Sequence, residues 1–192
     1  MKKLFIVIAA SAIVSCNSTG KSGSGDSSKT DTSSKSTTAT AGSEKKSDAD
    51  PSLMWKYGTD TDKMTSKLKF FAAINATNKL NFASPYEGGS IATITLRNED
   101  KKNEVILTID KGQFICHESD GCPIKVRFDS DPAISFKGGE PSDGSSTVLF
   151  IDPASKFITH AKKAKKMIVQ AEFYEEGVQD MMFNIDGLKW DH

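Results

Sequence analysis

The large apolar residues of this 192-residue chain are confined to two separate parts of it. Between Asn17 and Asp50 no apolar residue is larger than alanine, whereas every phenylalanine except Phe5 lies after Leu53. A segment without large apolar side chains cannot bury enough surface to offset the entropy lost on folding. The sequence therefore predicts one core-forming domain over residues 51–192, a length that suits a single domain.

The first residues have the pattern of a secretory signal peptide. Met1-Lys2-Lys3 supplies positive charge, and small residues follow an apolar run from Leu4 to Val14. That run is shorter than the roughly 20 residues that a membrane-spanning helix needs. We therefore predict a signal peptide over residues 1–15. The alternative, a buried helix of a cytosolic domain, would lack a neighbour to pack against because a polar stretch follows directly.

Residues Ile13-Val14-Ser15-Cys16 resemble the lipobox of bacterial lipoproteins. Ile13 stands where leucine is commoner and Ser15 where glycine or alanine is commoner, and both are permitted variants. The resemblance implies cleavage before Cys16 and palmitate-type acylation of this residue, which would anchor the chain in a lipid bilayer. Two or more acyl chains hold firmly, since each buried CH₂ contributes about 0.8 kcal/mol. The expected location is the cell envelope, at the outer membrane or periplasmic face if the host is Gram-negative, where Asn17 resembles a transfer-permitting signal.

The lipidated cysteine opens a polar tether that we predict over residues 16–50. Its 34 residues after the cysteine are mainly serine, threonine, glycine, lysine and aspartate, with charges that cancel. Such a segment is expected to stay disordered, with a root-mean-square span of roughly 30 Å. A passive spacer is the expected role, and the alternative is a segment that binds envelope polymer or carries glycans.

The domain after residue 51 has the alternation and turn pattern of β-strands. Residues 91–97 and 104–109 alternate around a polar turn and predict a hairpin, and residues 168–177 and 181–190 predict a closing hairpin. Residues 112–116 and 124–129 are predicted as a further strand pair, with Ile124, Val126 and Phe128 facing inward. The remaining predicted strands are 53–58, 67–82 (with a short helix as its alternative), 133–136 and 147–151.

One helix is predicted after residue 152, with Asp152 as N-cap and Pro153 at the first helical position. Its apolar face would hold Phe157, Ala161, Ala164 and Ile168. Its last turns would hold Lys162, Lys163, Lys165 and Lys166, where cations suit the helix dipole. The expected fold is mainly β: an antiparallel β-sandwich or open barrel with one α-helix near the C-terminal third.

Short motifs from Trp55 to Trp190 also resemble small bacterial and phage-borne envelope lipoproteins. These motifs are W-x-Y, P-Y-x-G-G, G-Q-F-x-C, V-R-F-D and G-L-x-W. That resemblance implies no established activity.

Acylation of Cys16 would leave Cys116 and Cys122 as an even pair in an export context that permits disulfides. They flank a short turn-like insert, and closing so small a loop would stabilise the fold by about 2 kcal/mol. We therefore predict a Cys116–Cys122 disulfide. The alternative is a metal site that also uses His117 and His160, but its spacing matches no usual zinc ribbon.

Recognisable catalytic motifs are scarce, since no G-x-S-x-G, H-E-x-x-H or phosphate-binding glycine loop occurs. Asp60 and Asp62 are spaced like calcium-loop ligands, but Met64 stands where a third oxygen ligand belongs. We therefore interpret the two aspartates as solvated turn carboxylates. Acid–base chemistry would have to draw on Glu172, Glu175, Glu176, Asp129 and Asp131.

The 25 basic and 25 acidic residues balance, so nothing drives the chain toward nucleic acid. We expect no cofactor and no metal, and a solvated face for the lysines near residue 165 rather than contact with anionic lipid or glycan. The expected function is a non-enzymatic lipoprotein whose domain binds an envelope protein or glycan, or an incoming protein. Inhibitor, immunity or superinfection-exclusion roles fit by analogy. The alternative is a hydrolase that acts on envelope glycan or polymer through acidic residues.

The anchor generates the first prediction. Replacing Cys16→Ser removes the thiol that would carry the diacylglycerol, so acyl labelling in cells is expected to be lost and the protein to leave the membrane fraction. Labelling that persists in this variant would contradict a lipid anchor at Cys16.

Overall fold

The structure is a computed structural model that describes residues 54–117 and 121–192. These residues belong to one compact unit, Lys46–His192. The predicted signal peptide (1–15) and the predicted tether (16–50) with Cys16 lie outside the described residues.

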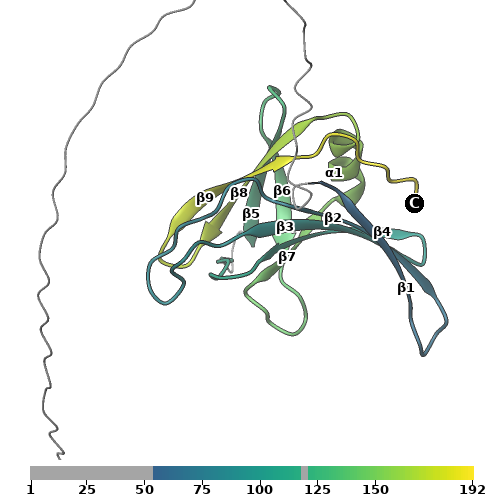
Figure 1. Cartoon of the computed structure of the whole chain (residues 1–192). Helices are drawn as coiled ribbons and strands as arrows, with labels where there is room; N and C mark the ends of the chain where they lie inside the picture. The colour runs from purple at the N-terminus through teal and green to yellow at the C-terminus, as the bar shows by residue number, and fades with distance from the viewer. Residues whose placement is uncertain (1–53, 118–120) are drawn as a thin grey trace, which may run out of the picture. The chain divides into compact units, whose positions relative to one another are not determined.

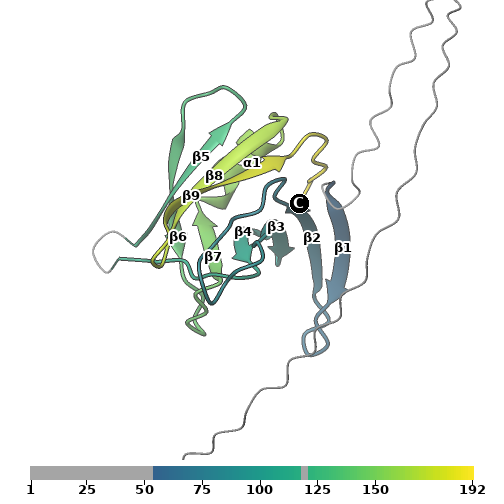
Figure 2. The ribbon, with the colours of Figure 1, turned by 60° about the vertical axis from the view of Figure 1, so that its left-hand side comes forward.

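Nine strands form one antiparallel sheet in the order β1-β2-β3-β4-β7-β6-β5-β8-β9 (Figure 1). The strands are β1 (Lys56–Thr61), β2 (Leu68–Asn75), β3 (Ala92–Glu99), β4 (Lys102–Ile109), β5 (Cys122–Phe128), β6 (Ile134–Gly139), β7 (Val148–Asp152), β8 (Lys166–Phe173) and β9 (Gly177–Asn184). The sheet curls without closing into a barrel, because no described strand pairing joins β1 to β9 (Figure 2). The mainly β class with one helix, α1 (Ala154–Ala161), is confirmed.

The core lies on the concave side of this sheet, because alternate side chains of a strand point to opposite faces. In β3 the buried apolar residues are Ala92, Ile94 and Leu96. In β5 they are Cys122, Ile124, Val126 and Phe128, which confirms the predicted inward face. The curved sheet therefore encloses one continuous apolar core.

Helix α1 covers part of this core. Its buried residues are Phe157, Ile158 and Ala161, and the Phe157 ring packs edge-on against Phe128 and Phe136 at centroid distances of 5.7 and 5.8 Å. These contacts fix the helix on the inner side of β5 and β6.

The predicted helix was wrong at both ends. The N-cap is Pro153 without a side-chain cap bond, and Asp152 is the last residue of β7. The helix ends at Ala161, and Ile168 belongs to β8, where it is held between Arg127 of β5 and Met182 of β9. Residues 166–173 pair with strands on both sides, and this pairing is favoured over a longer helix despite the helical spacing that includes Ile168. Lys163 and Lys165 therefore lie in the loop between α1 and β8 and not in a last helical turn.

The hairpin β3–β4 is confirmed, and residues 68–75 form a strand and not the alternative helix. The closing hairpin β8–β9 is also present, but β9 runs over Gly177–Asn184, so the predicted strand 181–190 was wrong beyond Asn184. The predicted pairing of residues 112–116 with 124–129 was wrong. Both sides of β5 are taken, by β6 and by β8. Residues 112–116 instead run beside the end of β8, where Ile115 N–H donates to the Glu172 carbonyl at 3.0 Å.

The residues after β9 return to the start of the described chain. The indole N–H of Trp55 donates to the Ile185 carbonyl at 3.0 Å, and Lys189 N–H donates to the Tyr57 hydroxyl at 2.8 Å. The buried Trp190 indole donates to Asn103 Oδ1 at 3.2 Å. The C-terminal segment therefore ties β9 to β1 and β4 through side chains.

The contact between β5 and β6 generates the second prediction. A Cβ added at Gly138 would lie 2.6 Å from Cys122 Cβ and 2.7 Å from its carbonyl oxygen. Gly138→Ala is therefore expected to lower the free energy of unfolding by about 1–3 kcal/mol, the usual cost of overpacking. Urea denaturation measures it.

The neighbouring glycine provides a matched control, because a Cβ at Gly139 would meet no atom within 4 Å. Gly139→Ala is expected to leave the unfolding midpoint nearly unchanged. Equal midpoints for the two variants would contradict the close approach at Gly138.

Candidate functional site

The outer surface of β5, β8 and β9 forms the candidate site, which we call the β5–β8–β9 face. Its side chains are those that point away from the core: Pro123, Lys125 and Arg127 of β5, Ile168, Gln170 and Glu172 of β8, and Val178, Asp180 and Met182 of β9. Strand register places Arg127, Ile168 and Met182 in one row. Lys125, Gln170 and Asp180 form the next row.

Three hollows follow one another along this face. The largest, of about 400 Å³, has Arg127 and Lys166 beside the apolar side chains of Ile168 and Met182. A second, of about 250 Å³, shares Arg127 and Ile168 with the first. A third, of about 180 Å³, shares Lys125 with the second. Neighbouring hollows share lining residues, so the three adjoin one another across the three strands, and we call this row of hollows the groove.

Apolar side chains remain open to solvent on this face. Met182 is 45% exposed and Val178 is 58% exposed, although both lie on a strand whose opposite face is buried. An outward strand position usually carries a polar residue, so exposed apolar residues gathered beside a groove are typical of contact surfaces.

The basic side chains of the groove lack acidic partners. Arg127, Lys125 and Lys166 make no ion pair with any carboxylate in residues 54–117 and 121–192. The nearby Asp129 is occupied, since its Oδ1 accepts the backbone N–H groups of Lys165 and Lys166 at 3.0 and 2.8 Å.

Asp180 at the other side of the groove accepts a hydrogen bond from Gln170 Nε2 at 2.9 Å. The face thus combines unpaired cations with apolar side chains. It can hold a ligand that carries a carboxylate or similar anion next to an apolar group.

The predicted disulfide is present: Cys116 and Cys122 are bonded, with Cα atoms 4.2 Å apart. It joins the 112–116 segment to the first residue of β5. His117 Nε2 lies 3.0 Å from Glu172 Oε2, whereas the His160 ring stacks on Phe128 at 5.3 Å. The alternative metal site is not assembled, and no group of three or more His, Cys, Asp or Glu side chains is placed to hold a metal within the described ranges.

Two of the acidic residues that a hydrolase would need have side-chain contacts within the fold, and two others lie in turns. Glu172 contacts His117, and Glu176 Oε1 accepts the backbone N–H of Ala83 at 2.6 Å. Glu175 occupies the β8–β9 turn with a φ of 60°. Asp131 lies in the turn after β5, where its N–H donates to the Phe128 carbonyl.

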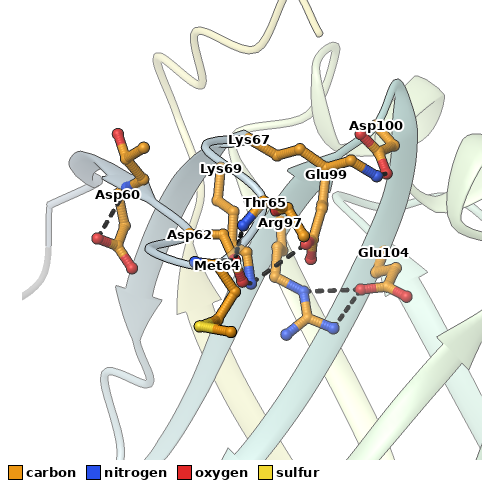
Figure 3. Close-up of polar contacts among 11 residues, drawn as sticks. Asp60, Asp62, Met64, Thr65, Lys67, Lys69, Arg97, Glu99, Asp100 and Glu104 are labelled. Carbon is orange, nitrogen blue, oxygen red and sulfur yellow. Dashed lines mark hydrogen bonds and ion pairs between the residues drawn. The ribbon is translucent and has the colours of Figure 1, made fainter.

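Asp62 is a turn carboxylate, as predicted, whereas Asp60 belongs to β1, where its Oδ1 accepts the N–H of Thr61 (Figure 3). Asp62 Oδ1 accepts the N–H groups of Met64 at 3.0 Å and Thr65 at 2.8 Å. Lys69 bridges Asp62 and Glu99 at 3.5 and 3.2 Å. Of the two carboxylates that resembled calcium ligands, Asp62 therefore closes the β1–β2 turn and pairs with Lys69, and Asp60 bonds to the next residue of its own strand.

The sequence interpretation missed the residues of the groove. Their signal lay in the outward positions of the predicted strands, where Ile168, Val178 and Met182 stand in place of polar residues. These apolar residues can be recognised as outward-facing only once it is known which face of β8 and β9 is buried.

No protein-family model, curated protein or solved structure matches the chain. Among residues 54–117 and 121–192, no helix is long and apolar enough to cross a membrane. The interpretation of the β5–β8–β9 face therefore rests on its own geometry.

The turn after β1 generates the third prediction. Hydrogen bonds from Thr65, first from its backbone N–H and then from its side chain, and from Met64 N–H lower the pKa of Asp62 from 3.8 to about 2. A folded-state pKa below the unfolded value means that the carboxylate stabilises the fold above pH 3.8 and that this contribution is lost as the pH falls toward 2. An NMR titration of the Asp62 carboxyl carbon should have its midpoint near 2.

Two variants test which interaction lowers the pKa of Asp62. Thr65→Val removes the hydroxyl donor and is expected to raise the midpoint clearly, whereas Lys69→Gln is expected to raise it less, because Lys69 is the smallest contributor. A larger rise in Lys69→Gln would mean that the ion pair, and not the turn, sets the pKa.

Proposed function

We propose that the chain is a lipid-anchored protein of the cell envelope whose domain is a binding module and not an enzyme. Its contact surface is the β5–β8–β9 face. The observation that carries this proposal is the groove in which the unpaired Arg127 borders Ile168 and Met182. The anchor rests on the lipobox-like residues that end at Cys16.

The chemistry of the groove favours a protein partner. Arginine and methionine are enriched where proteins meet, and an exposed methionine adapts its shape to the surface opposite. From Val178 to Met182 the groove follows four residue steps of β9, or about 14 Å. That length suits an extended segment of about four residues, in which a carboxylate could meet Arg127 while an apolar side chain covers Ile168.

The expected architecture of the whole chain agrees with such a role. A tether with a span of roughly 30 Å would let the domain search the space near the membrane without leaving it. An inhibitor, immunity or exclusion protein acts by occupying a partner and needs no catalytic groups, so the proposal extends to these classes by analogy. The partner itself is an envelope protein or an incoming protein.

The groove generates the fourth prediction. Residues 46–192, which contain every described strand and the helix, are immobilised and used to capture partners from an envelope extract, and the captured protein is purified for affinity measurement. Arg127→Glu and Ile168→Asp are each expected to weaken binding roughly thirtyfold, the effect of losing a central contact. The control is Lys63→Glu in the distant β1–β2 turn, which changes the charge by the same amount as Arg127→Glu and should leave the affinity unchanged.

Two results would contradict the proposal. If neither groove variant weakens capture, the partner binds elsewhere. If the domain turns over envelope glycan and Glu172→Gln abolishes turnover, the chain is a hydrolase and not a binding module.

A further inference from the structure

Strand β1 is an edge of the sheet, and no described strand pairs with its outer side. It pairs with β2 alone among the described strands, and all of its residues, Lys56–Thr61, are exposed. Both views place it at the outer border of the sheet (Figures 1 and 2). The backbone N–H and C=O groups along such an edge are a template for another strand.

The opposite edge of the sheet is covered. Thr77 N–H donates to the Met182 carbonyl at 2.7 Å. The Asn78 side chain accepts from Met182 N–H at 2.7 Å and donates to the Asp180 carbonyl at 2.9 Å. The segment after β2 thus satisfies backbone groups of β9 as a neighbouring strand would. The two edges of the sheet therefore differ: within the described residues, the outer side of β9 is hydrogen-bonded to another segment, whereas β1 has no strand on its outer side.

β1 also lacks two of the devices that prevent edge pairing, a bulge and a proline, although it carries the charged Lys56 and Asp60. Its register with β2 continues without a bulge from Lys56 to Thr61, and it contains no proline. Gly58 lies in the middle of the strand, with a φ outside the left-handed region, and a Cβ there would meet no atom within 4 Å.

Nothing in the described contacts of one copy requires a glycine at position 58. Glycine weakens a strand interior and often marks a place where another backbone approaches closely. Gly58 therefore points to a backbone that lies against β1 from outside.

The charges of β1 suit pairing with a second copy. Lys56 and Asp60 lie two residues on either side of Gly58, on the same face of the strand. Neither makes an ion pair with a described residue. A two-fold axis through Gly58, perpendicular to the sheet, sets Lys56 of each copy directly opposite Asp60 of the other, with Cβ atoms about 5 Å apart.

We propose that two copies of this chain pair through β1 in antiparallel orientation, with Gly58 at the two-fold axis, so that their sheets become continuous. The neighbouring two-fold registers suit the charges of β1 less well. An axis at Thr59 sets Asp60 opposite Gly58 and Lys56 opposite Asp62, whose carboxylate already binds the turn N–H groups and Lys69. An axis at Tyr57 sets Lys56 opposite Gly58. The interface is isologous, as closed dimers require. It does not depend on the lipid anchor or on the β5–β8–β9 face.

A charge-swap experiment tests the pairing and generates the fifth prediction. Sedimentation equilibrium of residues 46–192 at low ionic strength is expected to show a monomer–dimer equilibrium. Lys56→Glu and Asp60→Lys each set like charges opposite one another twice, so each is expected to lower the association constant roughly tenfold. The double variant Lys56→Glu/Asp60→Lys restores opposite charges and should restore association. Lys163→Glu is the control that changes the same charge away from β1.

The register is tested by cross-linking. Gly58→Cys is expected to form a covalent dimer under mild oxidation, because a residue on the two-fold axis faces its own copy, whereas Lys56→Cys should cross-link far less. A domain that stays monomeric at all concentrations would overturn the proposal, as would a dimer that ignores the charge swap. Dimerisation of residues 46–192 but not of residues 17–192 would also overturn it, because the preceding segment would then be the occupant of the edge.

Discussion

The need to cover one apolar sheet face is the constraint on which the rest of this structure depends. Most large apolar side chains of β2 to β9 point to one side of the sheet, and the eight-residue α1 covers only part of that side. The sheet therefore curls around its own core. Trp55, Ile185 and Trp190 draw its two ends together through side-chain hydrogen bonds. Because these devices cover the concave side alone, the convex side of β5, β8 and β9 is left open to solvent.

The local alternation of residues was sufficient to predict much of the fold. Ile94 and Leu96, or Val126 and Phe128, alternate with polar residues, and this period belongs to no other element. The predicted helix was too long because Phe157, Ala161, Ala164 and Ile168 also follow a helical spacing. From Lys166 onward the same chain alternates Met167, Val169 and Ala171 inward. The helical spacing and the strand alternation overlap in this segment, and pairing with the two neighbouring strands selects the strand. The sequence of a single segment does not show which strands will lie beside it.

The candidate site was harder to predict than the fold for the same reason. The Cys116–Cys122 disulfide needed only a count of cysteines and a short spacing. The groove needs β5, β8 and β9 side by side, although Arg127 and Met182 are far apart in the chain. Which of their side chains point outward follows from the register. The apolar character of Ile168 and Met182 becomes unusual only after that register is known, since buried positions are expected to be apolar.

The bonds between the two ends of the described fold have a consequence for how the chain is made. Trp55 and Ile185 are 130 residues apart, and Tyr57 and Lys189 are 132 apart. At 5–20 residues per second, a ribosome needs on the order of ten seconds to produce the partner of Trp55. During that interval the first strands can pair, but their apolar face lacks its cover. The apolar face of the first strands thus stays uncovered until the last segment of the domain has emerged from the ribosome.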